Sequence, residues 1–318
     1  MAMKLEAIRP VSVTLVSEVA FSAALLLGVS FVVFLVLYAA PGDPFSALLG
    51  DGVAARGGGA QEALGWAQTW YGQYFGWLSG MVQGNFGASI RSGQPVLGQV
   101  IDGAANTLVL TVTALLVSLF LALPVAVYSA VRGLTRLSWP LTMLAYVVSS
   151  LPVFWLGYIA IFVSTEHFGY FPLGSGFSNE FELAKFLLPM LVLGVGSGAI
   201  GEMVRYLRHE LSRVLDEEYI RTARAKGARV WRHAFKEGLL LPVTEILAAK
   251  VPFILGGAVI VEQIFNWPGI GRMAWQAAQD RDFPLIMGVV IASAVLVRAA
   301  SLVHRIVYVF VNPRASHE

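Results

Sequence analysis

Residues 103–131 read GAANTLVLTVTALLVSLFLALPVAVYSAV, an apolar stretch without a single charged side chain. About 20 mostly apolar residues in a helix cross the hydrocarbon core of a bilayer, which is about 30 Å thick. The stretch therefore predicts a membrane-spanning helix. The whole chain agrees, because 57% of its 318 residues are hydrophobic and only 13% are charged, against about 25% in soluble domains. We therefore exclude a soluble enzyme, a disordered chain and a collagen-like chain.

Six such spans are predicted along the chain. They lie near 19–39, 106–131, 140–163, 186–206, 244–264 and 285–311. The fifth is the least apolar, since Glu245, Lys250 and Glu262 fall within it. The first has a longer apolar run than the 7–15 residues of a signal-peptide core, so an uncleaved helix is favoured over a signal peptide. The predicted fold class is an all-α integral membrane protein with six transmembrane helices.

Lysine and arginine residues predict the orientation, because they accumulate in cytoplasmic loops. Sixteen of the 22 basic residues fall on the side that carries both termini, nine of them between 205 and 236, and five fall on the other side. Both termini are therefore predicted to be cytoplasmic. The resulting division is an N-terminal segment 1–18, a first helix 19–39, an extracytoplasmic loop 40–105, a core 106–311 with five transmembrane helices, and a cytoplasmic tail 312–318.

The long outer loop contains aromatic residues at helical spacings of three and four. They are Trp66, Trp70, Tyr71, Tyr74, Phe75 and Trp77. The spacing predicts an amphipathic helix, and aromatic rings are typical of the membrane interface. A helix packed on the transmembrane bundle explains the pattern equally well.

Signatures of enzymes and metal sites are missing from the sequence. The chain has no cysteine, which excludes disulfides, thiolate metal sites and cysteine nucleophiles. It has no G-x-x-x-x-G-K-[ST] motif for ATP phosphates, and its five histidines form no i, i+4 pair. A G-x-G-x-x-G match at 196–201 falls inside the fourth predicted span instead of after a strand. We therefore assign Gly194 and Gly198, which form G-x-x-x-G, to helix packing.

The inner loop contains the stretch EYIRTARAKG at 218–227. Acidic residues before and at its start suit a helix N-terminus, and Gly227 suits a left-handed C-terminal stop. We expect a helix of about three turns near 216–227, with Ala223 and Gly227 forming a small-residue stripe that another surface could approach. A basic loop on the lipid surface is the alternative, although lipid-binding stripes are bulkier.

Together with the residues LLP at 240–242, this stretch resembles the cytoplasmic signature loop, or EAA loop, of ABC importer permeases. The residues RTARAKG within it are similar to the sequence of the dipeptide, oligopeptide and nickel permease subgroup. Further stretches match the subgroup in the right order: APGDP at 40–44, SIRSGQPV at 89–96, WPGIGR at 267–272, DRDFP at 280–284 and NPR at 312–314. The chain departs from the pattern in three places. Arg221 aligns with the acidic residue of the loop, Arg305 replaces another acidic residue, and the segment 227–242 is about one turn short.

The resemblance implies a type I ABC importer (MetI-like) permease fold, in which the cytoplasmic loop forms a coupling helix that docks on an ATPase. The coupling residues would be Glu218, Tyr219, Arg221, Thr222, Ala223, Arg224, Ala225, Lys226 and Gly227. It also implies a second homologous permease subunit, two ATPases that bind ATP and Mg²⁺, and an extracytoplasmic solute-binding protein, assembled in a bacterial inner membrane.

The chain itself would then be no enzyme and would hold no cofactor or metal. Its function would be import by alternating access of peptides or related solutes, with peptide, nickel chelate, glutathione and oligosaccharide left open as substrates. An ATP-independent channel or secondary transporter is the alternative function.

Three ionisable residues at membrane depth are candidates for the translocation pathway: Lys250, Glu262 and Arg298. Such residues are costly in a bilayer and tend to face a cavity or a partner. Lys250 is expected to face the pathway, to pair with Glu202, or to snorkel to the cytoplasmic interface. For Glu262 the alternative is a tolerated charge at a helix end, and no pair between Glu262 and Arg298 is expected.

Overall fold

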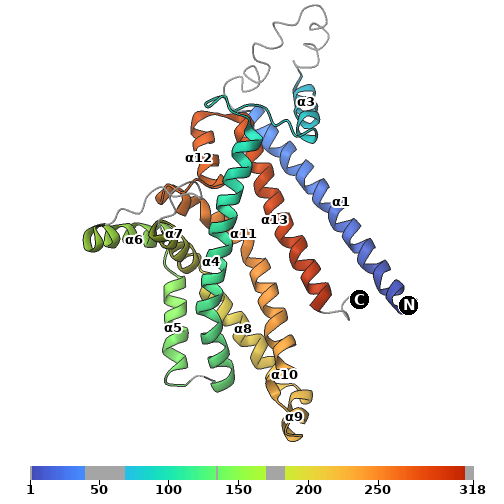
Figure 1. Ribbon diagram of the computed structural model, residues 1–318, viewed down its shortest axis with the longest axis vertical. Helices are drawn as coiled ribbons and strands as arrows, with labels where there is room; N and C mark the ends of the chain where they lie inside the picture. Colours follow the sequence, from blue (N-terminus) through green and yellow to red (C-terminus); the bar gives the residue numbers. More distant parts are fainter. Residues whose placement is uncertain (1, 40–68, 134, 170–182, 312–318) are drawn as a thin grey trace, which may run out of the picture. The chain divides into compact units, whose positions relative to one another are not determined.

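The computed structural model describes residues 2–39, 69–133, 135–169 and 183–311 (Figure 1). In these ranges the chain is built from helices and their connections, with one isolated bridge between Ala88 and Pro95. It divides into two compact units, Met1–Ala105 with Gly269–Arg298, and Asn106–Pro268 with Ala299–Glu318. The APGDP and NPR stretches of the sequence lie outside the described residues.

The first unit contains α1 (Ala2–Tyr38), α3 (Trp70–Val82), the start of α4 (Val96–Arg132), α12 (Ile270–Asp280) and the start of α13 (Phe283–Val311). Its core joins the last three of these helices. The buried residues are Val96, Val100, Ile270, Ala277, Leu285 and Val289. Gly288 permits the closest approach, because a Cβ atom there would lie 2.6 Å from a methyl carbon of Val96.

The aromatic helix of the outer loop packs on α1. Tyr74 is buried between Phe31 and Phe34, with ring centroids 5.4 and 5.3 Å from theirs in edge-on geometry. Its hydroxyl lies 3.0 Å from the hydroxyl of Ser30. Of the two explanations for the aromatic pattern, the structure therefore contains the packed helix. Trp70, Tyr71 and Phe75 remain exposed, and Trp66 lies outside the described residues.

The second unit contains the rest of α4, then α5 (Ser138–Ser149), α6 (Val153–Phe168), α7 (Leu183–Gly196) and α8 (Ala199–Asp216). There follow α9 (Glu218–Ala225), α10 (Val230–Phe235), the π-helix η1 (Lys236–Leu240) and α11 (Leu241–Ile264). Its apolar core includes Leu110 of α4, Leu193 of α7, Met203 and Leu207 of α8, and Ile254 of α11, all fully buried.

Four continuous helices are long and apolar enough to cross a membrane: Ser17–Tyr38, Val96–Arg132, Lys236–Ile264 and Phe283–Ile306. The third and fourth predicted spans are each broken. Ser138–Ser149 and Val153–Phe168 meet at a bend of 95°, and Lys185–Gly196 and Ala199–Asp216 at a bend of 54°. The described residues thus provide four spans, or up to six if each bent pair is one span. Each of the helices predicted near 140–163 and 186–206 is therefore two helices in the structure.

Each break has a local cause in the sequence. Pro152 lacks an amide hydrogen and disfavours helical geometry in the residue before it, and it stands as the extended N-cap of α6. Gly198 adopts φ +72°, a left-handed conformation that glycine reaches without a steric penalty, and it begins α8. Gly198 therefore lies in the break after α7 and starts α8, whereas the sequence analysis placed it inside the fourth span.

Candidate functional site

Helix α9 occupies the position of the expected coupling helix. It has eight residues, just over two turns, and is therefore shorter than the three turns expected. Its C-terminus closes as a Schellman motif: the amide of Gly227 donates to the carbonyl of Arg224 at 3.1 Å, and the amide of Ala228 donates to the carbonyl of Ala223 at 2.9 Å. Gly227 has φ +70°, so the predicted left-handed stop is confirmed.

One face of α9 packs on the chain itself. Ile220 is buried in a cluster with Val214 of α8 and Ala234 of α10. Ala223 is buried as well, whereas Gly227 is exposed, so the expected small-residue stripe does not form one open surface. The exposed residues of the stretch are Glu218, Tyr219, Arg221, Thr222, Arg224, Ala225, Lys226 and Gly227. These residues, half of them charged, define the surface that α9 offers to a partner.

A hydrogen bond connects α9 to the π-helix. The Tyr219 hydroxyl donates to Glu237 Oε2 at 3.0 Å. Burial, the hydrogen bond to Glu237 and the negative charge of Glu237 together raise the pKa of Tyr219 to about 12. Tyr219 thus stays protonated at neutral pH, and the bond persists there.

The π-helix is a feature that the sequence reading missed. Gly238 lies against α8, where a Cβ atom would come within 2.9 Å of Leu211 and 3.3 Å of Val214. Single π turns inside helices are rare and occur often at functional sites. The only signal in the sequence was Gly238, a glycine inside an otherwise helical segment. That this position has no room for a side chain is known only from the structure.

Two polar contacts join α8 to α11. Lys250 forms an ion pair with Glu202, and the Tyr206 hydroxyl donates to Glu245 Oε2 at 2.5 Å. The Lys250 side chain is 9% exposed and that of Glu202 is 48% exposed. Of the placements expected for Lys250, the structure contains the pair with Glu202.

Glu262 is completely buried near the end of α11, where Thr107 Oγ1 of α4 donates to its Oε1 at 2.6 Å. Glu262 therefore lies near a helix end, as one interpretation expected, but it is buried and hydrogen-bonded to a partner on another helix. The sequence could not reveal this, since Thr107 is 155 residues away.

Arg298 contacts three side chains of α1. Its Nη2 lies 2.9 Å from Glu18 Oε2, and its Nε donates to Ser22 Oγ at 3.0 Å. Its guanidinium also lies over the Phe21 ring, 5.3 Å from the centroid. The sequence reading overlooked Glu18, because this residue directly precedes the apolar run of α1.

Gly194 lies at a close approach of α7 to α4. A Cβ atom on Gly194 would lie 2.8 Å from the carbonyl oxygen of Ala114, and Ser118 Oγ donates to the carbonyl of Gly194 at 2.6 Å. Small residues allow such approaches between membrane helices. Gly198, the other assigned residue, has the different role described above.

Comparisons with known proteins show the family of the chain. Residues 122–317 match the family described as binding-protein-dependent transport system inner membrane component. The oligopeptide transport system permease protein AppB of Bacillus subtilis (strain 168) is 37% identical over 308 residues, covering 93% of this chain and 96% of that protein. The glutathione transport system permease protein GsiC of Escherichia coli (strain K12) is 33% identical over 292 residues, covering 90% and 92%.

Among solved structures, the MetNI methionine ABC transporter in inward-facing conformations is similar in fold. The TM-score is 0.53 at 17% identity, over 68% of this chain and 97% of that chain. The chain therefore belongs to the binding-protein-dependent transport system inner membrane component family. It is a membrane permease subunit of an ABC importer, which decides against the ATP-independent channel or secondary transporter.

Proposed function

We propose that this chain forms one half of the translocation pathway for peptides or related small solutes. Its partners would be a second homologous permease, two cytoplasmic ATPases that bind ATP and Mg²⁺, and an extracytoplasmic solute-binding protein. The names of the two relatives, an oligopeptide permease and a glutathione permease, support peptide-like solutes.

The observation that carries the proposal is the exposed, capped helix α9. Its outer side chains are exposed, while Ile220 packs against Val214 of α8 and Ala234 of α10. A push on α9 would therefore reach α8 through packed side chains and α11 through the bond from Tyr219 to Glu237. Packed interiors are dense and transmit displacement, which suits a coupling element.

The proposed location is a bacterial inner membrane with both termini in the cytoplasm. Six crossings result if each bent pair is one span. The nine basic residues between 205 and 236 support a cytoplasmic α9.

Within the membrane, we assign Lys250 and Glu202 to the pathway, because Glu202 remains about half exposed while it neutralises Lys250. The bonds of Glu262 to Thr107 and of Arg298 to Glu18 support packing roles for these two candidates.

The test is retention of the ATPases by the tagged chain in mild detergent. Arg224→Glu reverses a charge on the exposed face of α9 and is expected to abolish retention. Arg136→Glu is the matched control, since Arg136 is an exposed basic residue in the turn between α4 and α5. Absence of ATPases from the wild-type preparation would refute the proposed assembly, and equal retention by both variants would refute the role of α9.

A further inference from the structure

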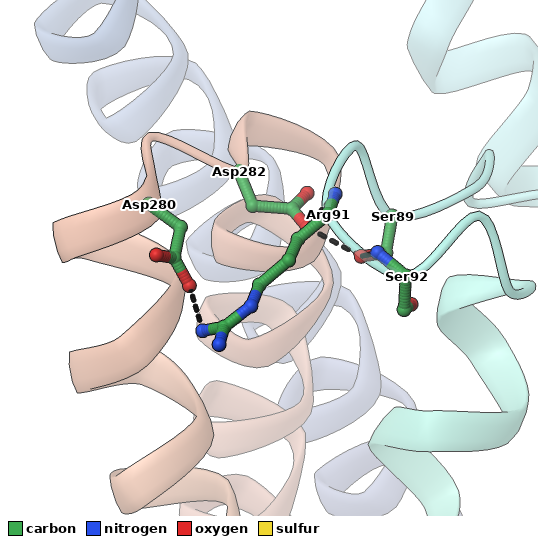
Figure 2. Close-up of polar contacts among 5 residues, drawn as sticks. All are labelled: Ser89, Arg91, Ser92, Asp280 and Asp282. Atoms are coloured by element: carbon green, nitrogen blue, oxygen red, sulfur yellow. Dashed lines mark hydrogen bonds and ion pairs between the residues drawn. The ribbon is translucent and has the colours of Figure 1, made fainter.

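Two of the family-like stretches, SIRSGQPV and DRDFP, meet in the structure although they are about 190 residues apart. Ser89 Oγ donates to Asp282 Oδ2 at 2.5 Å, and the two residues are buried. Arg91 forms an ion pair with Asp280, and its backbone amide donates to Asp282 Oδ2 at 3.3 Å. Figure 2 shows Arg91 and Ser89 reaching from one segment toward the two aspartates of the other. We call this set of four side chains the polar clasp.

The segment that carries Ser89 is a closed hairpin. Ala88 and Pro95 form a bridge, and the Ser89 amide donates to the Gln94 carbonyl at 2.9 Å. The Ser92 amide donates to Ser89 Oγ at 3.0 Å. Ser89 Oγ therefore accepts a bond from its own hairpin and donates one to Asp282. The hairpin leads directly into α4, which begins at Val96.

Asp282 connects this hairpin to the start of α13. Its Oδ1 accepts from the amide of Leu285 at 3.3 Å, in the first turn of α13, while its Oδ2 accepts from the hairpin. A carboxylate at a helix N-terminus is favoured by the unpaired amides and the helix dipole. One buried carboxylate thus orders the end of the α12–α13 turn, the start of α13 and the hairpin before α4.

Burial of a carboxylate is costly unless its hydrogen bonds are made. The apolar contact beneath, where Gly288 meets Val96, already holds α4 near α13. The polar clasp fixes the position of the two helix starts relative to each other, because hydrogen bonds depend on distance and angle. Apolar packing alone would allow the helices to slide.

We propose that Asp282 is a positioning residue that, through Ser89 and Arg91, makes the starts of α4 and α13 move as one rigid unit during transport. The inference rests on the proposed function, which places these helix starts at the outer end of the translocation pathway. Rigid linkage there would convert ATP-driven motion into opening of the outer end, and its loss would leave ATP hydrolysis poorly coupled to import.

The first test measures the linkage itself and needs no transported solute. The chain has no cysteine, so spin labels can be attached to I90C in the hairpin and W275C on α12, both exposed positions. In the reconstituted complex, the distance distribution between the labels should be the same without nucleotide and with ATP and vanadate. S89A should broaden it. S92A is the matched control, since Ser92 contacts the hairpin but not Asp282. A wild-type distance that changes between states, or an S89A distribution equal to that of S92A, would overturn the proposal.

The second test measures labelled tripeptide imported per ATP hydrolysed in proteoliposomes with the binding protein. S89A should lower this ratio by roughly tenfold, the scale of one lost charge-assisted hydrogen bond. A disulfide between V96C and G288C, where the side chains would be adjacent, should restore it in the S89A background. If Ser89 had a purely structural role, S89A would reduce the amount of folded complex and leave the ratio unchanged. That outcome would contradict the proposal. Lack of tripeptide import by the wild type would instead refute the proposed substrate class, while the label distances still decide the clasp.

Discussion

Replacing Arg298 by methionine removes three contacts between α13 and α1: the ion pair with Glu18, the bond to Ser22 and the cation–π contact with Phe21. Removing one partner of a buried ion pair costs about 3–5 kcal/mol. The Arg298 and Glu18 side chains are 16% and 23% exposed, so we expect the lower end, about 3 kcal/mol. At about 2 °C per kcal/mol, the apparent Tm should fall by about 6 °C. Ser22→Ala should cost about 1 kcal/mol, because it removes one acceptor.

The assay is thermal unfolding of the purified chain in detergent at one scan rate, arranged as a double-mutant cycle with Glu18→Gln. Arg298→Met and Glu18→Gln should be non-additive by about 2 kcal/mol, as expected for two residues in direct contact. Arg298→Lys is the control, since it keeps the charge and loses the paired geometry, and its cost should be intermediate. Additivity within about 0.5 kcal/mol would refute the reasoning.

Three further predictions concern α8, α9 and α11. Glu202→Gln should destabilise the chain by about 3 kcal/mol in urea or thermal unfolding, because it leaves the nearly buried charge of Lys250 without its partner. Lys250→Met should cost only about 1 kcal/mol, because the Glu202 charge that it leaves is half exposed. Equal costs would contradict this reasoning. Gly227→Ala should cost about 1–2 kcal/mol, because alanine is strained at φ +70°. No steric clash adds to this cost, since a Cβ there meets nothing within 4 Å. Hydrogen exchange in α9 should rise, and unchanged exchange would oppose the Schellman stop. Tyr219 has a pKa raised from 10.0 to about 12, so its stabilising effect should be complete below pH 10 and be lost as the pH rises toward 12. Tyr219→Phe should abolish that pH dependence, and a Tyr219 titration midpoint near 10 would contradict it.

The membrane class and much of the helix pattern could be predicted from the sequence. An apolar run such as 103–131 must form a helix in a bilayer, because only a helix pairs all its own backbone amide and carbonyl groups there. This holds whatever the tertiary arrangement. The end of α9 at Gly227 was also predictable, because a left-handed helix stop depends only on the local backbone and on a glycine at that position. Hydrophobicity alone did not locate the breaks at Pro152 and Gly198, since Pro152 lies within an apolar segment and Gly198 precedes the first following charge, Glu202, by four residues.

The polar partners were far less predictable. Lys250 was matched with Glu202 because both were unusual charges in apolar segments. Arg298 was not matched with Glu18, which borders the apolar run of α1 and carried no signal of its own. Sequence can indicate that a charge at membrane depth needs a partner, but the partner is selected by which helices come together.

The amino-acid sequence by itself determined that this chain is a helical membrane protein with a basic inner loop resembling that of importer permeases, because hydropathy, charge and short motifs are local properties. Only the tertiary structure decided that Ala223 is buried, that Glu262 bonds to Thr107 and that Asp282 bonds to Ser89. These depend on distances between residues far apart in the chain. Such distances are set by the packing of whole helices, which no local pattern encodes.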